Sequence, residues 1–141
     1  MKNKNIYYDF SIIIPVFCNE ESLEKIFERI LREIFSKNPS LTGEIIFVDD
    51  GSTDGSFNKL LDIRRKNTNV NCKIIKLTRN FGQVFATLAG YEYAQGKCVI
   101  NLAADLQEPP EIINEMLQHF LDEEVDIVIA VRSTREESFF T

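Results

Sequence analysis

The chain has 141 residues, 44% of them hydrophobic and 27% charged, which corresponds to about one domain with a substantial apolar core. Its net charge of −6 argues against a nucleic-acid-binding protein, because such proteins present a basic face to the phosphate backbone. The three cysteines are scattered and form no CxxC pair, which favours buried, reduced thiols over a zinc site or a disulfide: Cys18, Cys72 and Cys98.

Two features bear on where the protein resides. No apolar run reaches the roughly 18 residues of a membrane span, and the N-terminus has no signal-peptide core. We therefore expect a soluble, cytoplasmic chain that forms a single domain over residues 1–141. The regular pattern stops near residue 131 and the sequence closes on Phe139 and Phe140, so we expect a longer protein that is truncated at its C-terminus.

Apolar runs of strand length alternate with segments of helix length along the chain. The runs are rich in Ile and Val, as in strands that are covered on both faces. The elements expected in chain order are a strand at Phe10–Val16, a helix at Ser22–Phe35, a strand at Glu44–Val48, a helix at Ser56–Lys66, a strand at Lys73–Leu77, a helix at Gln83–Ala94, a strand at Cys98–Ala103, a helix from Pro110 to about Asp122, and a strand at Asp126–Val131.

The first helix carries the clearest signal. Its apolar residues follow the i, i+3, i+4, i+7 spacing of one buried face, and Asn19 stands where an N-terminal cap is expected. Pro110 suits the first turn of the last helix, where a missing N–H costs nothing. The βαβαβαβαβ order predicts an α/β fold with a mostly parallel sheet and helices on both faces.

In such a sheet a ligand lies beyond the carboxyl ends of the strands. Polar residues follow each predicted strand at that edge: Asn19 and Glu20, then 49–56, then 79–82, then 105–107, and finally Arg132. Several carboxylates with few fixed cations suit a ligand that brings its own metal ion, such as a diphosphate with Mg²⁺ or Mn²⁺. The sequence has no GxGxxG after the first strand and no GxxxxGK[ST], which excludes the common dinucleotide and P-loop sites.

Four blocks at these strand ends resemble the successive motifs of a family-2 glycosyltransferase with the GT-A fold: SIIIPVFCNEE, EIIFVDDGSTDGS, LTRNFGQVFATLAGYEYAQGK and LAADLQEPPE. Within that family they are most similar to the polyprenyl-phosphate, or dolichol-phosphate-mannose-synthase-like, sugar transferases. The four blocks in order and at matching separations make the resemblance specific, whereas DDGS alone would be weak.

The resemblance implies roles for particular residues. Those that match its nucleotide-sugar-binding positions are Pro15, Phe17, Glu20, Val48, Asp50, Gly82, Ala104 and Arg132. Asp105 matches the last position of the family's Asp-x-Asp motif, which holds Mg²⁺ or Mn²⁺ against the donor diphosphate, and Gln107 matches a further metal-site position. Ala103 stands where the family often has its first Asp, so metal binding is expected to be weak before the nucleotide arrives.

The activity implied is inverting transfer of a sugar from a UDP- or GDP-sugar to a polyprenyl phosphate or a glycan, as in cell-envelope glycan biosynthesis. A base for the acceptor is expected beyond Thr141, or is not needed because a phosphate acceptor is already ionised. Membrane association would come only through segments after residue 141. Much of the acceptor half of the site is also expected there, which argues against catalysis by the fragment alone.

Other interpretations stay open. The protein could be a non-catalytic nucleotide-sugar binder. A receiver-like signalling domain is disfavoured, because such a domain has an acidic pair after its first strand, an Asp at the end of its third and a Lys at the end of its fifth. This chain has none of these at the corresponding predicted strand ends. Locally, Asp49 and Asp50 could form a plain turn, and Glu20 could only favour a helix N-terminus. Residues 79–82 could be a structural loop in which Asn80 caps the next helix and Phe81 packs inward. Arg132 and His119 could be ordinary surface residues.

Overall fold

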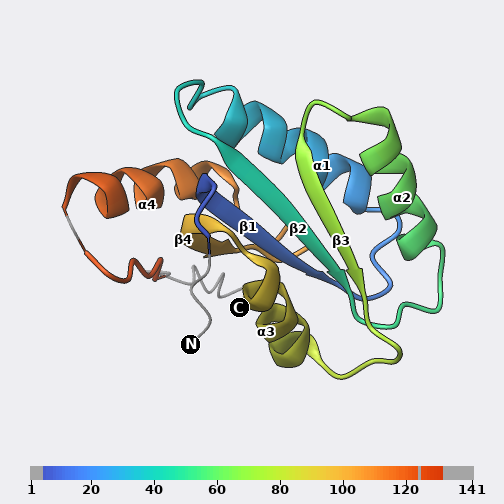
Figure 1. Cartoon of the computed structure of the whole chain (residues 1–141). Coiled ribbons are helices and arrows are strands. Elements are labelled where there is room, and N and C mark those ends of the chain that lie inside the picture. The colour runs from blue at the N-terminus through green and yellow to red at the C-terminus, as the bar shows by residue number, and fades with distance from the viewer. Residues whose placement is uncertain (1–4, 124, 132–141) are drawn as a thin grey trace, which may run out of the picture.

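Four parallel strands form the centre of the computed structural model, which describes residues 5–123 and 125–131 (Figure 1). They are β1 (Tyr8–Val16), β2 (Gly43–Asp49), β3 (Asn71–Lys76) and β4 (Gly96–Asn101). The sheet order is β3-β2-β1-β4, so β1 and β2 have a hydrogen-bonded neighbour on each side. This is the parallel α/β arrangement that the sequence predicted.

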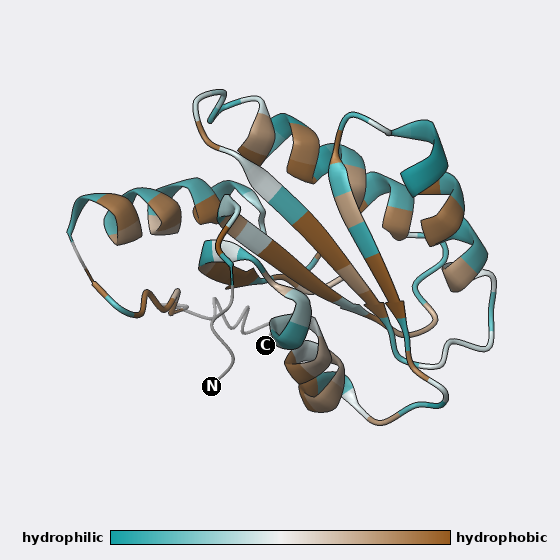
Figure 2. Ribbon diagram, in the orientation of Figure 1, coloured by the Kyte–Doolittle hydropathy of each residue, from teal (hydrophilic) through white to brown (hydrophobic). Residues whose placement is uncertain are grey.

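Helices cover both faces of the sheet. On one face lie α1 (Leu23–Ile30), which continues as a π-helical turn η1 (Leu31–Phe35), α2 (Ser56–Lys66) and α4 (Glu111–Asp122). On the other face lies α3 (Gln83–Tyr93). Figure 2 shows the apolar strands between these layers. Among the described residues, no helix has both the length and the apolarity needed to cross a bilayer.

The core divides between the two faces because strand side chains alternate. Even-numbered residues of β1 such as Ile12 and Ile14 pack with Phe27 and Leu60 below α1 and α2. Ile13 faces α3, where it packs with Ile46, Val48 and Ala86. Continuous Ile and Val runs are therefore required in the central strands, since each face of the sheet needs its own apolar set.

The predicted fifth strand at Asp126–Val131 was wrong, because the structure assigns no strand there. Within the described chain β4 pairs only with β1, and an apolar run becomes a strand only when a neighbour satisfies its backbone. Ile127, Ile129 and Val131 are instead 76%, 74% and 81% exposed. The segment borders, with β4 and α4, a groove of about 1190 Å³.

The predicted cap at Asn19 was also wrong. The N-cap residue of α1 is Ser22, and the Asn19 side chain instead accepts a hydrogen bond from the Phe17 backbone N–H at 2.9 Å. The Asn19 side chain therefore organises the loop that precedes the helix. A short amide side chain can bond to nearby backbone in a loop as readily as it can cap a helix.

A buried polar network joins the strands at the amino end of the sheet. Glu44 is fully buried in β2. Its Oε1 accepts hydrogen bonds from the Ser11 hydroxyl at 2.6 Å and the Gln95 N–H at 2.7 Å. The Lys73 ammonium lies 2.7 Å from Glu44 Oε2, which makes an ion pair between β2 and β3.

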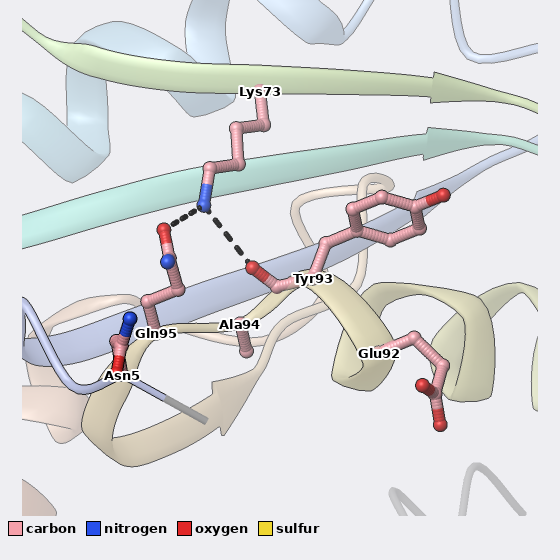
Figure 3. A pocket seen from close by; sticks show the side chains of 6 residues that line it. All are labelled: Asn5, Lys73, Glu92, Tyr93, Ala94 and Gln95. Atoms are coloured by element: carbon pink, nitrogen blue, oxygen red, sulfur yellow. Dashed lines mark hydrogen bonds between the residues drawn. The ribbon is translucent and has the colours of Figure 1, made fainter. Parts of the chain in front are cut away.

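Lys73 also fixes the turn between α3 and β4. Its ammonium donates to the Gln95 side chain at 2.7 Å and to the Tyr93 carbonyl at 3.1 Å, as Figure 3 shows. The side chain borders a hollow of about 230 Å³ that is open to Asn5 and Glu92. The network thus ties β1, β2, β3 and the α3–β4 turn to one buried carboxylate.

We expect Glu44→Gln to lower the free energy of unfolding by about 2 kcal/mol, because Lys73 would lose the partner for its half-buried charge. Urea denaturation measures this change. The control is Lys97→Gln, which removes the exposed ion pair with Asp9 and should cost no more than about 0.5 kcal/mol. Equal losses in the two variants would contradict a special role for the buried network.

Candidate functional site

The carboxyl ends of all four strands meet at one edge of the sheet. The chain passes from β1 to β2 and β3 in one direction, and β4 then adds on the other side of β1. The crossovers therefore diverge at β1, and in open α/β sheets the ligand crevice lies at such a switch point. The loops that follow β1, β2 and β4 surround it.

Asp50 holds three of these strand ends together. It is only 2% exposed, and its two carboxylate oxygens accept hydrogen bonds from the Phe81 and Gly82 backbone N–H groups at 2.8 and 2.9 Å. Its own N–H donates to the Val16 carbonyl at 2.8 Å. Asp50 thus fixes the loop after β3 against the ends of β1 and β2, and each oxygen keeps acceptor capacity for a further donor.

The residue after Asp50 must be glycine. Gly51 has φ +71°, and a Cβ there would lie 2.4 Å from the carbonyl carbon of Arg79. Only a residue without a side chain allows the β2 and β3 loops to approach this closely. The plain-turn interpretation of this segment is therefore incomplete, because the turn also seats the next loop.

Asp49, the other half of the acidic pair, lies on the opposite face of the sheet. It is fully buried, and neither carboxylate oxygen has a hydrogen-bond partner within the described part of the chain. A buried carboxylate without a partner costs stability. The two adjacent aspartates therefore differ completely in their surroundings.

Serines of the β2 loop hold the loop after β1. The Cys18 N–H donates to Ser52 Oγ at 3.0 Å, and the Asn19 N–H donates to Ser56 Oγ at 2.9 Å. Cys18 has φ 53°, an unusual conformation for a residue with a side chain, which these contacts support. The two loops thus form one unit at the edge of the sheet.

Glu20 belongs to the same unit. Its Oε2 accepts a hydrogen bond from the Gly55 N–H at 3.0 Å, while its side chain stays exposed to solvent. Asp54 accepts from the Ser56 N–H at 3.0 Å. Burial raises the pKa of Asp54, but the hydrogen bonds from the Ser56 hydroxyl and N–H outweigh it, so that its pKa is lowered.

The remaining residues expected at the nucleotide differ in exposure. Phe17 is 46% exposed at the end of β1 and Pro15 is half-buried, whereas Val48 is fully buried against the α3 face of the sheet. Of these three, Phe17 presents the aromatic surface that a ligand in the crevice would meet. Arg132 lies outside the described residues.

The loop after β4 is tied to the start of α1. Ala104 is buried, and its carbonyl accepts a hydrogen bond from the Ser22 hydroxyl at 2.6 Å. Asp105 is exposed, and its Oδ1 accepts from the Gln107 N–H at 3.1 Å across Leu106, which has φ 63°. This turn brings Asp105 and Gln107 to the rim together.

Glu108 completes that turn. Its Oε2 accepts a hydrogen bond from the Ala103 N–H at 3.1 Å. A carboxylate therefore lies against the backbone of Ala103, whose own side chain supplies none. The sequence reasoning missed this contact, although a Glu just before the Pro109–Pro110 pair was the available signal.

The loop after β3, residues 79–82, differs from the predicted structural loop, in which Asn80 caps the next helix and Phe81 packs inward. The N-cap residue of α3 is Gly82, with φ 97°, rather than Asn80. Phe81 is 39% exposed, and the Arg79 guanidinium carbon stacks 4.0 Å from the centre of its ring. His119 is a solvent-facing residue of α4, which agrees with the interpretation of it as an ordinary surface residue. Its Nδ1 lies 2.7 Å from Glu123 Oε1.

The oxygen atoms at the rim suit a hard divalent ion that takes most of its coordination from a bound diphosphate and water. Asp105 and Gln107 offer one carboxylate and one amide oxygen at the rim, and no cluster of three or more acidic, His or Cys ligands occurs in residues 5–123 and 125–131. Mg²⁺ needs only one or two protein oxygens when phosphates and water complete its shell. The residues present therefore fit a metal that arrives with a diphosphate.

None of the three cysteines, which all lie in the described chain, forms a disulfide there, and Cys72 and Cys98 are half-buried. Burial raises the pKa of Cys72 to about 11, so this thiol is unreactive. The prediction of a buried thiol was wrong for Cys18, which is exposed because it lies in the loop after β1.

Comparison with known proteins relates the chain to glycosyltransferases. Residues 11–141 match the model of glycosyl transferase family 2. An uncharacterized glycosyltransferase of Synechocystis, sll0501, is 42% identical over 91% of this chain and 39% of its own length. The undecaprenyl-phosphate 4-deoxy-4-formamido-L-arabinose transferase of Yersinia pestis is 39% identical over 92% of the chain and 38% of its own length.

The fold agrees with these sequence matches. A mannosyltransferase from Pyrobaculum calidifontis, solved in complex with GDP-Man and Mn²⁺, superimposes with a TM-score of 0.62 at 19% identity, over 74% of this chain and 31% of its own. The chain spans about two fifths of the length of the curated relatives it matches. The sheet is thus the GT-A type of α/β fold, and the chain belongs to glycosyl transferase family 2.

Proposed function

We propose that this glycosyltransferase domain binds a nucleotide-diphosphate sugar, UDP- or GDP-linked, at the crevice around the end of β1 and supports inverting transfer of the sugar to a polyprenyl phosphate. The observation that carries the donor site is the placement of Asp50 and Asp105 in loops on either side of β1, at the topological switch point. The polyprenyl-phosphate acceptor, rather than a glycan, rests on the Yersinia relative's name.

The nucleoside would lie between Phe17 and the β2 loop. Asp50 is already fixed by two backbone N–H donors, so its remaining lone pairs point to a fixed place where a base or ribose donor can bind. Gly82 contacts Asp50 directly, and Glu20 is proposed to reach the same ligand from the loop after β1. The chain thereby orients the donor without having to reorganise.

Asp105 and Gln107 would hold Mg²⁺ or Mn²⁺ against the donor diphosphate. When bound, that ion acts as a Lewis acid for the charge that develops on the leaving diphosphate. The turn through Leu106 presets the separation of the two side chains, and the Ser22–Ala104 hydrogen bond anchors the turn to α1. Arg132 is proposed to approach the phosphates from the segment that follows.

A non-catalytic nucleotide-sugar binder is the second candidate, and Ala103 is the observation that favours it. The hydrogen bond from the Ala103 N–H to Glu108 speaks for the enzyme instead, because it keeps a carboxylate beside the position where the family often has its first Asp. Turnover by a longer form of the protein that includes residues after 141 would decide for the enzyme, whereas donor binding without turnover would decide for the binder.

We expect Asp105→Asn to abolish the enhancement of donor binding by Mn²⁺, because the amide oxygen is a far weaker ligand for a hard cation. Calorimetric titration with UDP- and GDP-sugars, with and without Mn²⁺, measures it. Glu115→Gln, an exposed carboxylate change on α4, is the matched control and should bind as the unaltered chain does. Metal-enhanced binding that survives in Asp105→Asn would show that the metal site is elsewhere.

Asp50→Ala should reduce both donor affinity and stability. Removal of the carboxylate leaves the Phe81 and Gly82 N–H groups without their acceptor, which costs about 2 kcal/mol of unfolding free energy. Urea denaturation and the same titrations measure the two effects. Asp126→Ala, at an exposed carboxylate, serves as the control. An Asp50→Ala protein of unchanged stability would contradict the structural part of the assignment.

A further inference from the structure

Arg79 is a lone cation at the carboxyl edge of the sheet. The loops that follow β1, β2, β3 and β4 span residues 17–22, 50–55, 77–82 and 102–110, all within the described chain, and together they hold six carboxylates and one Lys or Arg. The Arg79 side chain is exposed, and among the described residues its guanidinium forms no ion pair. Its charge is therefore available to a ligand.

The guanidinium of Arg79 is held in place by its own loop. Its central carbon lies 4.0 Å from the centre of the Phe81 ring, and its Nη1 donates to the Asn80 carbonyl at 3.4 Å. The Phe81 N–H in turn donates to Asp50 Oδ1 at 2.8 Å. The backbone of Arg79 also packs against Gly51, where a Cβ would lie 2.4 Å from the Arg79 carbonyl carbon. The cation is thus preset in the loop that the Asp50 carboxylate holds.

The same loop leaves open space next to Asp50. Gly82 donates its N–H to Asp50 Oδ2 at 2.9 Å, and a Cβ on Gly82 would meet no atom within 4 Å. Phe17, which is 46% exposed, follows β1, the neighbour of β2 in the sheet. A flat ring that enters this space would find a fixed hydrogen-bond acceptor in the carboxylate and a fixed donor in the guanidinium.

The strand order separates Arg79 from the proposed diphosphate site. Arg79 follows β3 at one margin of the sheet, whereas Asp105 and Gln107 follow β4 at the other (Figure 1). Three strand spacings of about 4.8 Å each put these loops roughly 14 Å apart. An arginine that far from the metal end of a nucleotide donor faces the nucleoside end.

We propose that Arg79 and Asp50 together recognise a nucleobase with an N–H next to a carbonyl, the carbonyl bound by Arg79 and the N–H by Asp50. Uracil and guanine carry this pair of groups. Cytosine and adenine instead carry an unprotonated ring nitrogen next to an amino group, which reverses both hydrogen bonds. The inference rests on the proposed function, and it makes Arg79 a residue that selects UDP- or GDP-linked donors over CDP- or ADP-linked ones.

A guanidinium suits this role better than an ammonium does. It is planar, so its face can stack on Phe81 while the N–H groups at its edge donate to a ligand. An amino base in the same place would set donor against donor at Arg79 and acceptor against acceptor at Asp50. Leaving such fixed polar groups unpaired weakens binding more than the loss of an apolar contact does.

Calorimetric titration of the 141-residue chain with UDP, GDP, CDP and ADP, at one Mg²⁺ concentration, tests the proposal. We expect UDP or GDP to bind at least about tenfold more tightly than both CDP and ADP, which is the size of one good base-reading pair. Arg79→Met keeps a stem against Phe81 but has no donor. It should lower the affinity for the preferred nucleotide about tenfold and leave CDP and ADP nearly unchanged, because these two never gained the contact.

Two further variants separate base recognition from charge alone. Arg79→Lys keeps the charge without the planar fork, so we expect it to lose most of the preference for uracil or guanine. Arg65→Met changes an exposed arginine near the end of α2, which pairs with Asp62, and is the matched control. It should bind all four nucleotides as the unaltered chain does. Urea denaturation of Arg79→Met should give an unchanged midpoint, because the side chain is exposed.

Equal losses for all four nucleotides in Arg79→Met, with affinity kept in Arg79→Lys, would overturn the proposal and assign the guanidinium to the phosphates. Unchanged affinities in Arg79→Met, or CDP or ADP bound by the unaltered chain as tightly as UDP and GDP, would overturn it too. Nucleotide binding itself survives in each of these cases, so the proposed function stands. No binding of any of the four nucleotides to the unaltered chain would sink the proposed function and the inference together.

Discussion

The structure of the candidate site depends on the carboxylate of Asp50. Its two oxygens hold the Phe81 and Gly82 N–H groups, and its backbone N–H holds the Val16 carbonyl, so one residue joins the ends of β1, β2 and β3. Gly51 makes this possible, since any side chain there would collide with the backbone of Arg79. The serines of the same loop then fix the β1 loop. A preorganised edge of this kind binds a ligand without first having to order its own loops.

The opposite end of the sheet is held by different means. There Glu44 gathers Ser11, Gln95 and Lys73 around one buried carboxylate, and the contacts span three strands. The loops at the carboxyl end can therefore carry polar and glycine-rich sequences that contribute little apolar burial. The division between a stabilising amino end and a ligand-facing carboxyl end is general in parallel sheets, because the crossover loops at the carboxyl end are the ones that surround the crevice.

Much of the fold was predictable because its signals are local. The continuous Ile runs of β1 and β2 and the helical spacing from Leu23 to Ile34 predicted those elements, and the alternation predicted the parallel sheet. The run at Asp126–Val131 misled, because hydrophobicity does not reveal whether a strand has a partner to pair with. At the candidate site, the sequence predicted that Asp50 and Asp105 follow strand ends, which is where the structure has them. The hydrogen bonds of the Ser22, Ser52 and Ser56 hydroxyls to neighbouring loops were not predictable, because they join residues more than 30 positions apart. Such contacts leave no periodic pattern to read.

The central claim is that the crevice around the end of β1 binds a nucleotide-diphosphate sugar together with a divalent ion. Nitrogen-15 NMR of the chain, titrated with a UDP- or GDP-sugar and Mg²⁺, tests this most directly, because each backbone N–H reports on its own surroundings. The account predicts that the largest shifts fall on Phe81 and Gly82, on the β1 and β2 loops, and on Gln107. An absence of shifts with every donor, or shifts gathered in the groove between β4 and α4, would contradict it.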